Sequence, residues 1–251
     1  MPSSTIARFE PKGPRGKLER LEDFTASILE TDQPVQYGHL YMDDSQHGFS
    51  AGVWECTPFR TTLLPYPVNE FMLILEGSVT IVEAGGHETT IHAGEIFALP
   101  KGLPCQWKQT GDVRKYYVIF DDTSGMEPGD SAMLRVVRPD PRGRLEDIGP
   151  PPAELLLSSA PIQHAREWFL DATGQWAVGV WDTTAYRRKP RPSPCHELMH
   201  ILEGSVTLTD EAGHPHSFAA GDTVFVPLGA VCGWDCSEYL RKVYCTFRPT
   251  A

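Results

Sequence analysis

Two glutamates and two lysines that could do acid, base or ligand chemistry occur at matching positions of this sequence, 127 residues apart. Glu70 and Glu197 each lie seven residues before the glycine of a Leu-Glu-Gly triplet, and Lys115 and Lys242 follow later in each copy. A glutamate buried beside apolar groups has a raised pKa and can act as a general acid or base. A lysine in the same pocket can bind an anion. The alternative is that each glutamate and lysine form a structural ion pair.

Aromatic side chains and cysteines accompany these charged residues. Trp107 lies two residues beyond Cys105, and Trp234 two residues beyond Cys232, so on a strand each tryptophan faces the same side as its cysteine. Each tryptophan is either the wall of a ligand pocket or a core residue, and the core role is the commoner one for large aromatics. Further pairs coincide under the same offset: Arg60 with Arg187, and Tyr117 with Tyr244.

The second copy offers a set of soft metal ligands. If the Glu197 side chain points into the barrel, the Cys195 side chain points the same way, because residues two apart on a strand share a face. Cys232 can then lie in the same pocket. Two thiolates and a carboxylate suit zinc, although cysteine is also a frequent small core residue. His196 and His200 match the zinc-protease string His-Glu-x-x-His, but that chemistry needs a helix, and this stretch is predicted to be a strand. Alternation therefore predicts both histidines on the outer face.

The whole chain is a tandem duplication. Residues 11–120 match residues 138–247 without an insertion or deletion, and Ile74 to Thr80 is repeated almost unchanged as Ile201 to Thr207. A repeat of this length predicts two domains of about 110 residues, each large enough to bury a core. We expect an N-terminal domain at 11–120, a linker at 121–137 and a C-terminal domain at 138–248.

Short apolar runs separated by glycine and proline predict the strands that must position these side chains. An all-β sandwich or barrel is the expected fold class because no convincing amphipathic helix is present. In the first copy the expected strands are 52–56, 70–75, 78–83, 89–92, 96–99, 105–109 and 114–120. Residues 11–50 show a weaker pattern. The helix-like run Leu18 to Phe24 matches a segment of copy two that leads into Pro150-Pro151-Pro152, so both segments are expected to be extended connections.

Composition and charge exclude some partners. The 251 residues carry a net charge of −11, which disfavours nucleic acid and anionic membrane surfaces. No stretch is long and apolar enough to span a bilayer, and the N-terminus does not resemble a signal peptide. We expect a cytoplasmic protein whose six cysteines are reduced thiols.

Two glycine-anchored segments in each copy resemble the two motif regions of the cupin superfamily. They are the Glu70 and Gly77 spacing, repeated at Glu197 and Gly204, and the series Gly94, Pro100 and Gly102, repeated at Gly221, Pro227 and Gly229. With Gly-Val-Trp upstream and Arg-Lys-x-Tyr near the end, the chain most resembles ethanolamine-utilisation Q-like cupins and ureidoglycine aminohydrolase. The resemblance implies two jelly-roll barrels in one chain, a bicupin.

Metal-binding cupins resemble one another in offering two histidines, a glutamate and a third histidine. Glu70 and Glu197 match the glutamate, but no histidine occupies any of the other positions. Those positions hold Leu64, Tyr66 and Cys105 in copy one, and Arg191, Ser193 and Cys232 in copy two. A guanidinium at position 191 repels a cation but can hold a carboxylate or phosphate.

Two functions remain open. In the first, the protein is an enzyme acting on a small polar or anionic metabolite, in amine, ureide or amino-acid breakdown as the resemblance implies. The C-terminal barrel then uses Glu197, Lys242 and Tyr244 for catalysis, and Cys195, Glu197 and Cys232 hold one divalent metal, either zinc, manganese, iron or nickel. The residues expected to bind the substrate are Glu70, Cys105, Trp107, Lys115, Tyr117, Arg191 and Trp234.

In the second function, the protein is a metal-free bicupin that binds a small molecule or serves a structural role without catalysis. This alternative explains the missing histidines directly. Association into a homodimer is an expectation compatible with both functions, as is the absence of nucleic-acid and membrane partners.

Overall fold

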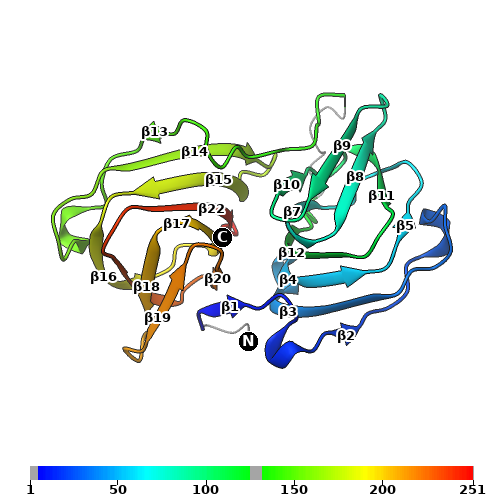
Figure 1. Cartoon of the computed structure of the whole chain (residues 1–251). Coiled ribbons are helices and arrows are strands. Elements are labelled where there is room, and N and C mark those ends of the chain that lie inside the picture. Colours follow the sequence, from blue (N-terminus) through cyan, green and yellow to red (C-terminus); the bar gives the residue numbers. More distant parts are fainter. Residues whose placement is uncertain (1–4, 125–131, 251) are drawn as a thin grey trace. The chain divides into compact units, whose positions relative to one another are not determined.

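The computed structural model describes residues 5–124 and 132–250, and they form two β-rich units (Figure 1). Of the described residues, one unit contains 9–124, 132–138 and 171–173, and we call it the N-terminal barrel. The other contains 5–8, 139–170 and 174–250, and we call it the C-terminal barrel. No helix among the described residues is long and apolar enough to cross a membrane.

The N-terminal barrel consists of two antiparallel sheets. The first has the strand order β10-β7-β12-β4-β3-β2, and the second β5-β11-β8-β9, with β6 also pairing with β11. The strands are β2 (Glu19–Arg20), β3 (Gln36–Asp44), β4 (Phe49–Cys56), β5 (Phe59–Arg60), β6 (Leu64–Pro65), β7 (Asn69–Glu76), β8 (Ser78–Glu83), β9 (Glu88–His92), β10 (Ile96–Leu99), β11 (Pro104–Gln109) and β12 (Val113–Phe120). Single-turn 3₁₀ helices lie at Pro14–Gly16, Ala26–Ile28 and Ser45–His47.

The C-terminal barrel repeats this arrangement. Its sheets have the orders β1-β20-β17-β22-β15-β14-β13 and β16-β21-β18-β19. The strands are β1 (Ala7–Phe9), β13 (Glu146–Asp147), β14 (Gln163–Leu170), β15 (Trp176–Thr183), β16 (Tyr186–Pro192), β17 (His196–Glu203), β18 (Ser205–Thr209), β19 (Pro215–Ala219), β20 (Thr223–Val226), β21 (Val231–Cys236) and β22 (Leu240–Phe247), with a 3₁₀ turn at Ala153–Leu155.

The sequence pattern predicts these strands closely. All seven expected strands of the first copy are present, and their bounds differ by at most a few residues. Leu18 to Phe24 is not helical and contains the short strand β2. The weakly patterned stretch 11–50 also contains β3, a nine-residue strand paired with β4, and its counterpart β14 pairs with β15. β3 carries Gln36, Tyr37, His39 and paired aspartates, so its composition hides its buried positions.

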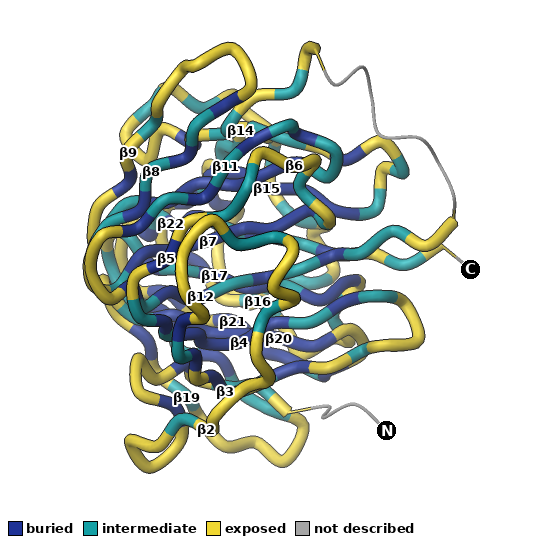
Figure 2. The backbone as a smooth tube through the Cα atoms, turned by 90° about the vertical axis from the view of Figure 1, so that its right-hand side faces the viewer, coloured by how far each residue is buried: buried dark blue, intermediate teal, exposed yellow. Residues whose placement is uncertain are grey.

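Each barrel encloses its own hydrophobic core between its two sheets. Figure 2 shows buried residues running along the strands while the connecting loops are exposed. The repeated glycine of the Leu-Glu-Gly triplet has a steric cause. Gly77 and Gly204 have positive φ, and a Cβ there would lie 2.1 Å from the Asp112 carbonyl oxygen or 2.0 Å from that of Tyr239. No other residue fits this corner.

The segment between the repeats lies partly against the N-terminal barrel. Val137 exchanges backbone hydrogen bonds with Ala98, and the Val136 amide donates to Glu83 Oε1 at 2.9 Å. Residues 125–131 of the expected linker lie outside the described residues. Near the other end of the chain, residues 5–8 belong to the C-terminal barrel, where β1 pairs with β20 and Arg8 forms an ion pair with Asp222 at 2.5 Å.

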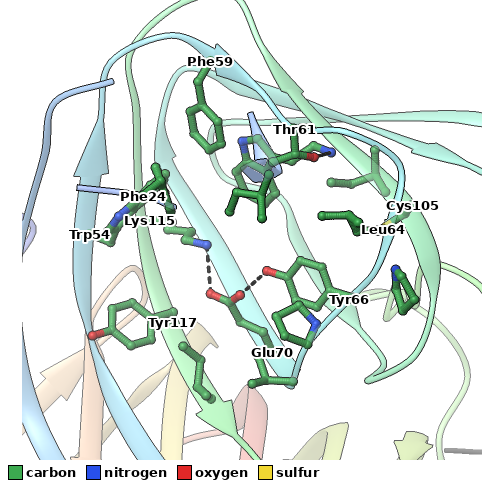
Figure 3. Close-up of a pocket in the computed structure, with 17 residues that line it drawn as sticks. Phe24, Trp54, Phe59, Thr61, Leu64, Tyr66, Glu70, Cys105, Lys115 and Tyr117 are labelled. Atoms are coloured by element: carbon green, nitrogen blue, oxygen red, sulfur yellow. Dashed lines mark hydrogen bonds and ion pairs between the residues drawn. The ribbon is translucent and has the colours of Figure 1, made fainter. Parts of the chain in front are cut away.

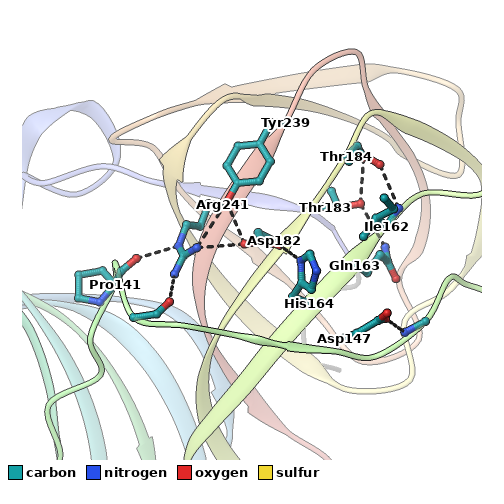
Figure 4. A network of polar contacts seen from close by, with 12 residues as sticks. Pro141, Asp147, Ile162, Gln163, His164, Asp182, Thr183, Thr184, Tyr239 and Arg241 are labelled. Carbon is teal, nitrogen blue, oxygen red and sulfur yellow. Dashed lines mark hydrogen bonds and ion pairs between the residues drawn. The ribbon is translucent and has the colours of Figure 1, made fainter.

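A polar network fixes the start of the C-terminal barrel to its first sheet (Figure 4). The buried Asp182 carboxylate accepts hydrogen bonds from Arg241 Nη1 at 3.0 Å and Tyr239 Oη at 2.8 Å, and it contacts His164 Nδ1 at 2.8 Å. Arg241 also donates to the carbonyl oxygens of Pro141 and Gly143. The guanidinium thereby connects the entry segment to β15 and β22.

Candidate ligand sites in the two barrels

The N-terminal barrel contains a cavity of about 530 Å³. Apolar and aromatic side chains form most of its wall, and three polar side chains meet inside it (Figure 3). The lining residues are Phe24, Ile28, Trp54, Phe59, Thr61, Leu64, Pro65, Tyr66, Pro67, Val68, Glu70, Ile81, Cys105, Trp107, Lys115, Tyr117 and Ile119. A mainly apolar cavity with a few convergent polar groups is typical of a small-molecule site.

The polar group is centred on Glu70, which begins β7. Lys115 Nζ on β12 donates to Glu70 Oε1 at 2.8 Å, and Tyr66 Oη donates to Oε2. The side chains of Lys115 and Glu70 are only 8% and 6% exposed, so this is a buried ion pair. Both carboxylate oxygens have a partner, which offsets the cost of burying the charge.

Aromatic rings and a thioether surround the Lys115 ammonium. Its nitrogen lies 4.7 Å from the ring centroid of Trp54 and 4.6 Å from that of Trp107. It also lies 3.2 Å from Met72 Sδ. Cation–π contacts of this kind stabilise a desolvated cation by about 2 kcal/mol or less each. Trp54 and Trp107 are therefore part of the hydrophobic core and also line the cavity beside the lysine.

Burial keeps the neutral acids of this cavity protonated. Desolvation, together with the Glu70 charge, raises the pKa of Tyr66 well above its ordinary value. Desolvation also raises the pKa of Tyr117, with a smaller effect from Glu70. Burial raises the pKa of Cys105 to about 12. At neutral pH both phenols are hydrogen-bond donors and the Cys105 sulfur is a thiol, which is a poor nucleophile.

The C-terminal barrel contains the same arrangement of charge. Lys242 Nζ donates to Glu197 Oε1 at 2.7 Å and lies 3.0 Å from Met199 Sδ. The ring centroids of Trp181 and Trp234 lie 4.9 and 5.2 Å from the ammonium. The duplicated residues of the sequence therefore produce a duplicated three-dimensional unit.

The two units differ at the position of Tyr66. Its counterpart, Ser193, donates to the Cys195 carbonyl oxygen at 2.7 Å and not to the glutamate. The Glu197 side chain is 23% exposed, compared with 6% for Glu70. The second glutamate is therefore more accessible, and its other carboxylate oxygen is available for a ligand.

The expected metal ligands do not form a metal site. Among residues 5–124 and 132–250, no group of three or more His, Cys, Asp or Glu side chains is placed to hold a metal ion, and this includes Cys195, Glu197 and Cys232. Burial raises the pKa of Cys195 and of Cys232 to about 11, and the Glu197 charge adds to this at both thiols. Glu197 is already paired with an ammonium, so the donor set does not fit a divalent cation.

Other side chains cover the two histidines of the His-Glu-x-x-His string, which the sequence places on the strand face opposite Glu197. His196 is 3% exposed, is stacked against Phe225 and Phe247, and accepts a hydrogen bond from the Leu228 amide at 3.1 Å. His200 Nδ1 lies 2.9 Å from Thr223 Oγ1. Alternation along a strand separates them from Glu197, but it does not reveal what covers the opposite face.

The remaining predicted residues have varied surroundings. Tyr117 lines the N-terminal cavity, and its counterpart Tyr244 packs with its hydroxyl against Gly179, where a Cβ would lie 2.3 Å from that oxygen. Arg60, Arg187 and Arg191 are exposed. Arg191 lies opposite Cys232 in the pairing of β16 with β21.

Sequence reasoning missed three contributors to these units. In the sequence, Trp54 and Trp181 served only as markers of the repeat. A tryptophan present in both copies, on the strand paired with that of Lys115 or Lys242, could have indicated a contact with the lysine. Tyr66 attracted notice only because it stands where a metal-binding cupin has histidine. No sequence signal indicates that its hydroxyl reaches Glu70, since that depends on the corner between β6 and β7.

Comparison with known proteins places this double barrel among the cupins. The EutQ-like cupin domain model matches residues 44–117 and 170–244, so it matches both repeats. The chain therefore belongs to the EutQ-like cupin family, as a bicupin. No curated protein sequence matches it.

Solved structures support the same fold. A protein of unknown function from Pseudomonas syringae pv. tomato is 26% identical with a TM-score of 0.77, over 97% of this chain and 100% of that one. A cupin 2 conserved barrel domain protein from Leptotrichia buccalis is 9% identical with a TM-score of 0.59, over 89% and 100%. Protein Ylba from E. coli is 11% identical with a TM-score of 0.55, over 99% and 93%.

Proposed function

We propose that this bicupin is a metal-free small-molecule-binding protein, whose N-terminal barrel holds a small, mainly apolar molecule bearing one uncharged polar group. One observation carries the proposal: the Glu70 carboxylate is held between Lys115 and Tyr66 inside an apolar cavity of about 530 Å³. The polar group of the ligand is recognised there, and the cavity wall holds the rest.

The charge balance of the cavity defines the polar group. Lys115 and Glu70 neutralise one another, and a charged ligand would have to separate a buried pair to gain a partner. Breaking such a pair is costly. A hydroxyl or amide avoids this cost because it can donate a hydrogen bond to a lone pair of Glu70 or of the Tyr66 hydroxyl oxygen while the Lys115–Glu70 pair stays intact.

The same residues argue against the metal-dependent enzyme. An ammonium contacts the glutamate at the expected metal position in both barrels, at 2.8 and 2.7 Å. A second cation on the same carboxylate would be repelled. The proposal therefore assigns ligand binding, and not metal-assisted catalysis, to Glu70, Lys115, Glu197 and Lys242.

Ligand-observed NMR with benzyl alcohol tests the N-terminal site. Benzyl alcohol has an apolar ring and one hydroxyl, and toluene is the matched probe without the hydroxyl. We expect saturation transfer to benzyl alcohol that is stronger than transfer to toluene. Leu64→Trp should abolish it by filling the cavity mouth, whereas Leu63→Trp, on an exposed neighbour outside the lining, should not. Equal signals from all samples would overturn the proposal.

Elemental analysis separates the two functions. Protein purified without chelator is expected to carry far less than one equivalent of metal, and EDTA should leave its melting temperature unchanged. About one equivalent of zinc, manganese, iron or nickel that is lost in Cys232→Ala would restore the metal-dependent enzyme as the better interpretation.

A further inference from the structure

The two barrels differ at positions that line the N-terminal cavity. Thr61 and Leu64 line the N-terminal cavity, and their counterparts at the repeat offset are Arg188 and Arg191. Uncharged positions in one barrel are thus cationic in the other. The protein as a whole has a net charge of −11, so a local excess of positive charge is unusual here.

Strand pairing places both arginines on the inner face of β16. Arg188 lies opposite Trp234, and Arg191 lies opposite Cys232. Directly opposed residues of an antiparallel pair project from the same face. Trp234 covers the Lys242 ammonium, so the two guanidinium groups belong to the same side of the sheet as the Lys242–Glu197 pair.

Two thiols of this barrel have cationic neighbours. The positive charges of Arg188 and Lys242 oppose the burial that raises the pKa of Cys232. Arg248 and Lys242 act in the same way on the pKa of Cys195. Arg188, Arg248 and Lys242 therefore lie near these thiols, together with the Glu197 carboxylate.

The arginines have no carboxylate of their own. In the described part of the chain, none of Arg188, Arg191 and Arg248 forms an ion pair with an acidic side chain. In the N-terminal barrel, by contrast, the position equivalent to Arg248 is Asp121, which pairs with Lys101 at 2.9 Å. Position 248 therefore carries a positive charge where the matching position of the N-terminal barrel carries a negative one.

We infer that the C-terminal barrel is a second ligand site, selective for a small carboxylate that also carries a hydroxyl or amino group. Arg188 and Arg191 bind the carboxylate, because guanidinium groups match its two oxygens. The accessible Glu197 accepts a hydrogen bond from the second group, at the place where Glu70 of the other barrel is covered by Tyr66. This site is additional to the one proposed in the N-terminal barrel.

Calorimetric titration with lactate, lactamide, propionate and inorganic phosphate tests the assignment. Lactate has the carboxylate and the hydroxyl, lactamide lacks only the charge, and propionate lacks only the hydroxyl. We expect lactate to bind more tightly than propionate and lactamide not to bind. Binding of lactamide as tight as that of lactate, or of phosphate without lactate, would overturn the inference, as would no binding at all.

Variants of β16 provide the matched control. Arg188→Gln combined with Arg191→Gln should weaken lactate binding by about tenfold or more, the loss expected when charged hydrogen bonds are removed. Arg187→Gln changes the same charge on the same strand, but Arg187 lies opposite the exposed Asp235. It should leave the affinity unchanged, and an equal loss in Arg187→Gln would contradict a built site.

The experiments on the two proposed sites have independent outcomes. Leu64→Trp should remove benzyl alcohol binding and leave lactate binding intact, and the arginine variants should do the reverse. Failure of the benzyl alcohol experiment therefore does not affect the lactate experiment. Equal melting temperatures of the native protein and the arginine variants show that folding is preserved.

Discussion

Lys115 and Lys242 occupy the same position in the two barrels. The ammonium of each forms an ion pair with a glutamate and contacts two tryptophan rings. A fixed internal cation thus stands beside the carboxylate that a metal-binding cupin would use as a ligand. Duplication has preserved this unit while the residues around it diverged. The unit is therefore a property of the scaffold, and ligand selectivity depends on what surrounds it.

Removing the Lys115 charge should destabilise the N-terminal barrel strongly. Lys115→Met leaves the Glu70 carboxylate buried without its cation, and we expect a loss of about 3–5 kcal/mol in the free energy of unfolding. Urea denaturation measures it. The double variant Lys115→Met, Glu70→Gln should recover much of the loss, because no charge then remains unpaired.

A surface pair provides the control for that experiment. Lys108 and Glu88 lie 3.8 Å apart with exposed side chains, so Lys108→Met should cost less than about 1 kcal/mol. A similar cost for both lysine variants would show that the buried pair contributes nothing special.

Acid should destabilise the C-terminal barrel through His200. Burial lowers the pKa of this imidazole to about 4 from an ordinary value of 6.5. Between these values the unfolded chain binds the proton and the folded chain does not, so stability is full above about pH 6.5 and falls as the pH decreases towards 4. We expect His200 to account for about 2–3 kcal/mol of this fall.

Denaturation of His200→Gln across that pH range checks the assignment. The variant should lose less stability on acidification than the native protein does. His214→Gln, whose side chain is 75% exposed in the native protein, should retain the native pH dependence. Identical pH profiles for the native protein and His200→Gln would contradict the role of His200.

Gly179 should tolerate no side chain. A Cβ there would lie 2.3 Å from the Tyr244 hydroxyl and 2.7 Å from the Arg166 carbonyl oxygen. Gly179→Ala should therefore destabilise the protein by about 1–3 kcal/mol through overpacking. Thermal unfolding measures the effect, and Gly111→Ala, where a Cβ meets nothing within 4 Å, should be nearly neutral.

Replacing Asp182 should loosen the entry to the C-terminal barrel. Asp182→Asn removes the charge that holds Arg241 and Tyr239, and we expect a loss of about 1.5–3 kcal/mol, the value of a charged hydrogen bond. Hydrogen exchange should show faster exchange in the strands β15 and β22. Asp235→Asn, at an exposed position, should change neither the stability nor the exchange rates.

The repeat made most of the fold predictable. A strand pattern seen twice at one offset is more reliable than either copy, and glycines such as Gly77 and Gly204 mark the same forced corners. The strand β3 escaped because it is rich in polar residues. Its burial comes from pairing with β4, which is a long-range fact that local composition does not contain.

The sites were only partly predictable, for a related reason. Spacing placed Glu197 and Cys195 on one face of a strand. It could not show that Lys242, 45 residues away, forms an ion pair with Glu197 there. It separated His196 from Glu197 without showing that Phe225 and Phe247 enclose the ring. Charge differences between the copies, such as Thr61 against Arg188, were readable from the sequence once the lining of one cavity was known.

The strand β1 has a consequence for the history of the duplicated chain. β1 completes a sheet whose other strands all follow Pro139 in the sequence. The second repeat alone therefore lacks one strand of the C-terminal barrel. Expressed from residue 139, that half would present the hydrogen-bonding edge of β20 to solvent, and open edges promote self-association. The two halves are copies in sequence, but the second depends on a strand that precedes the first.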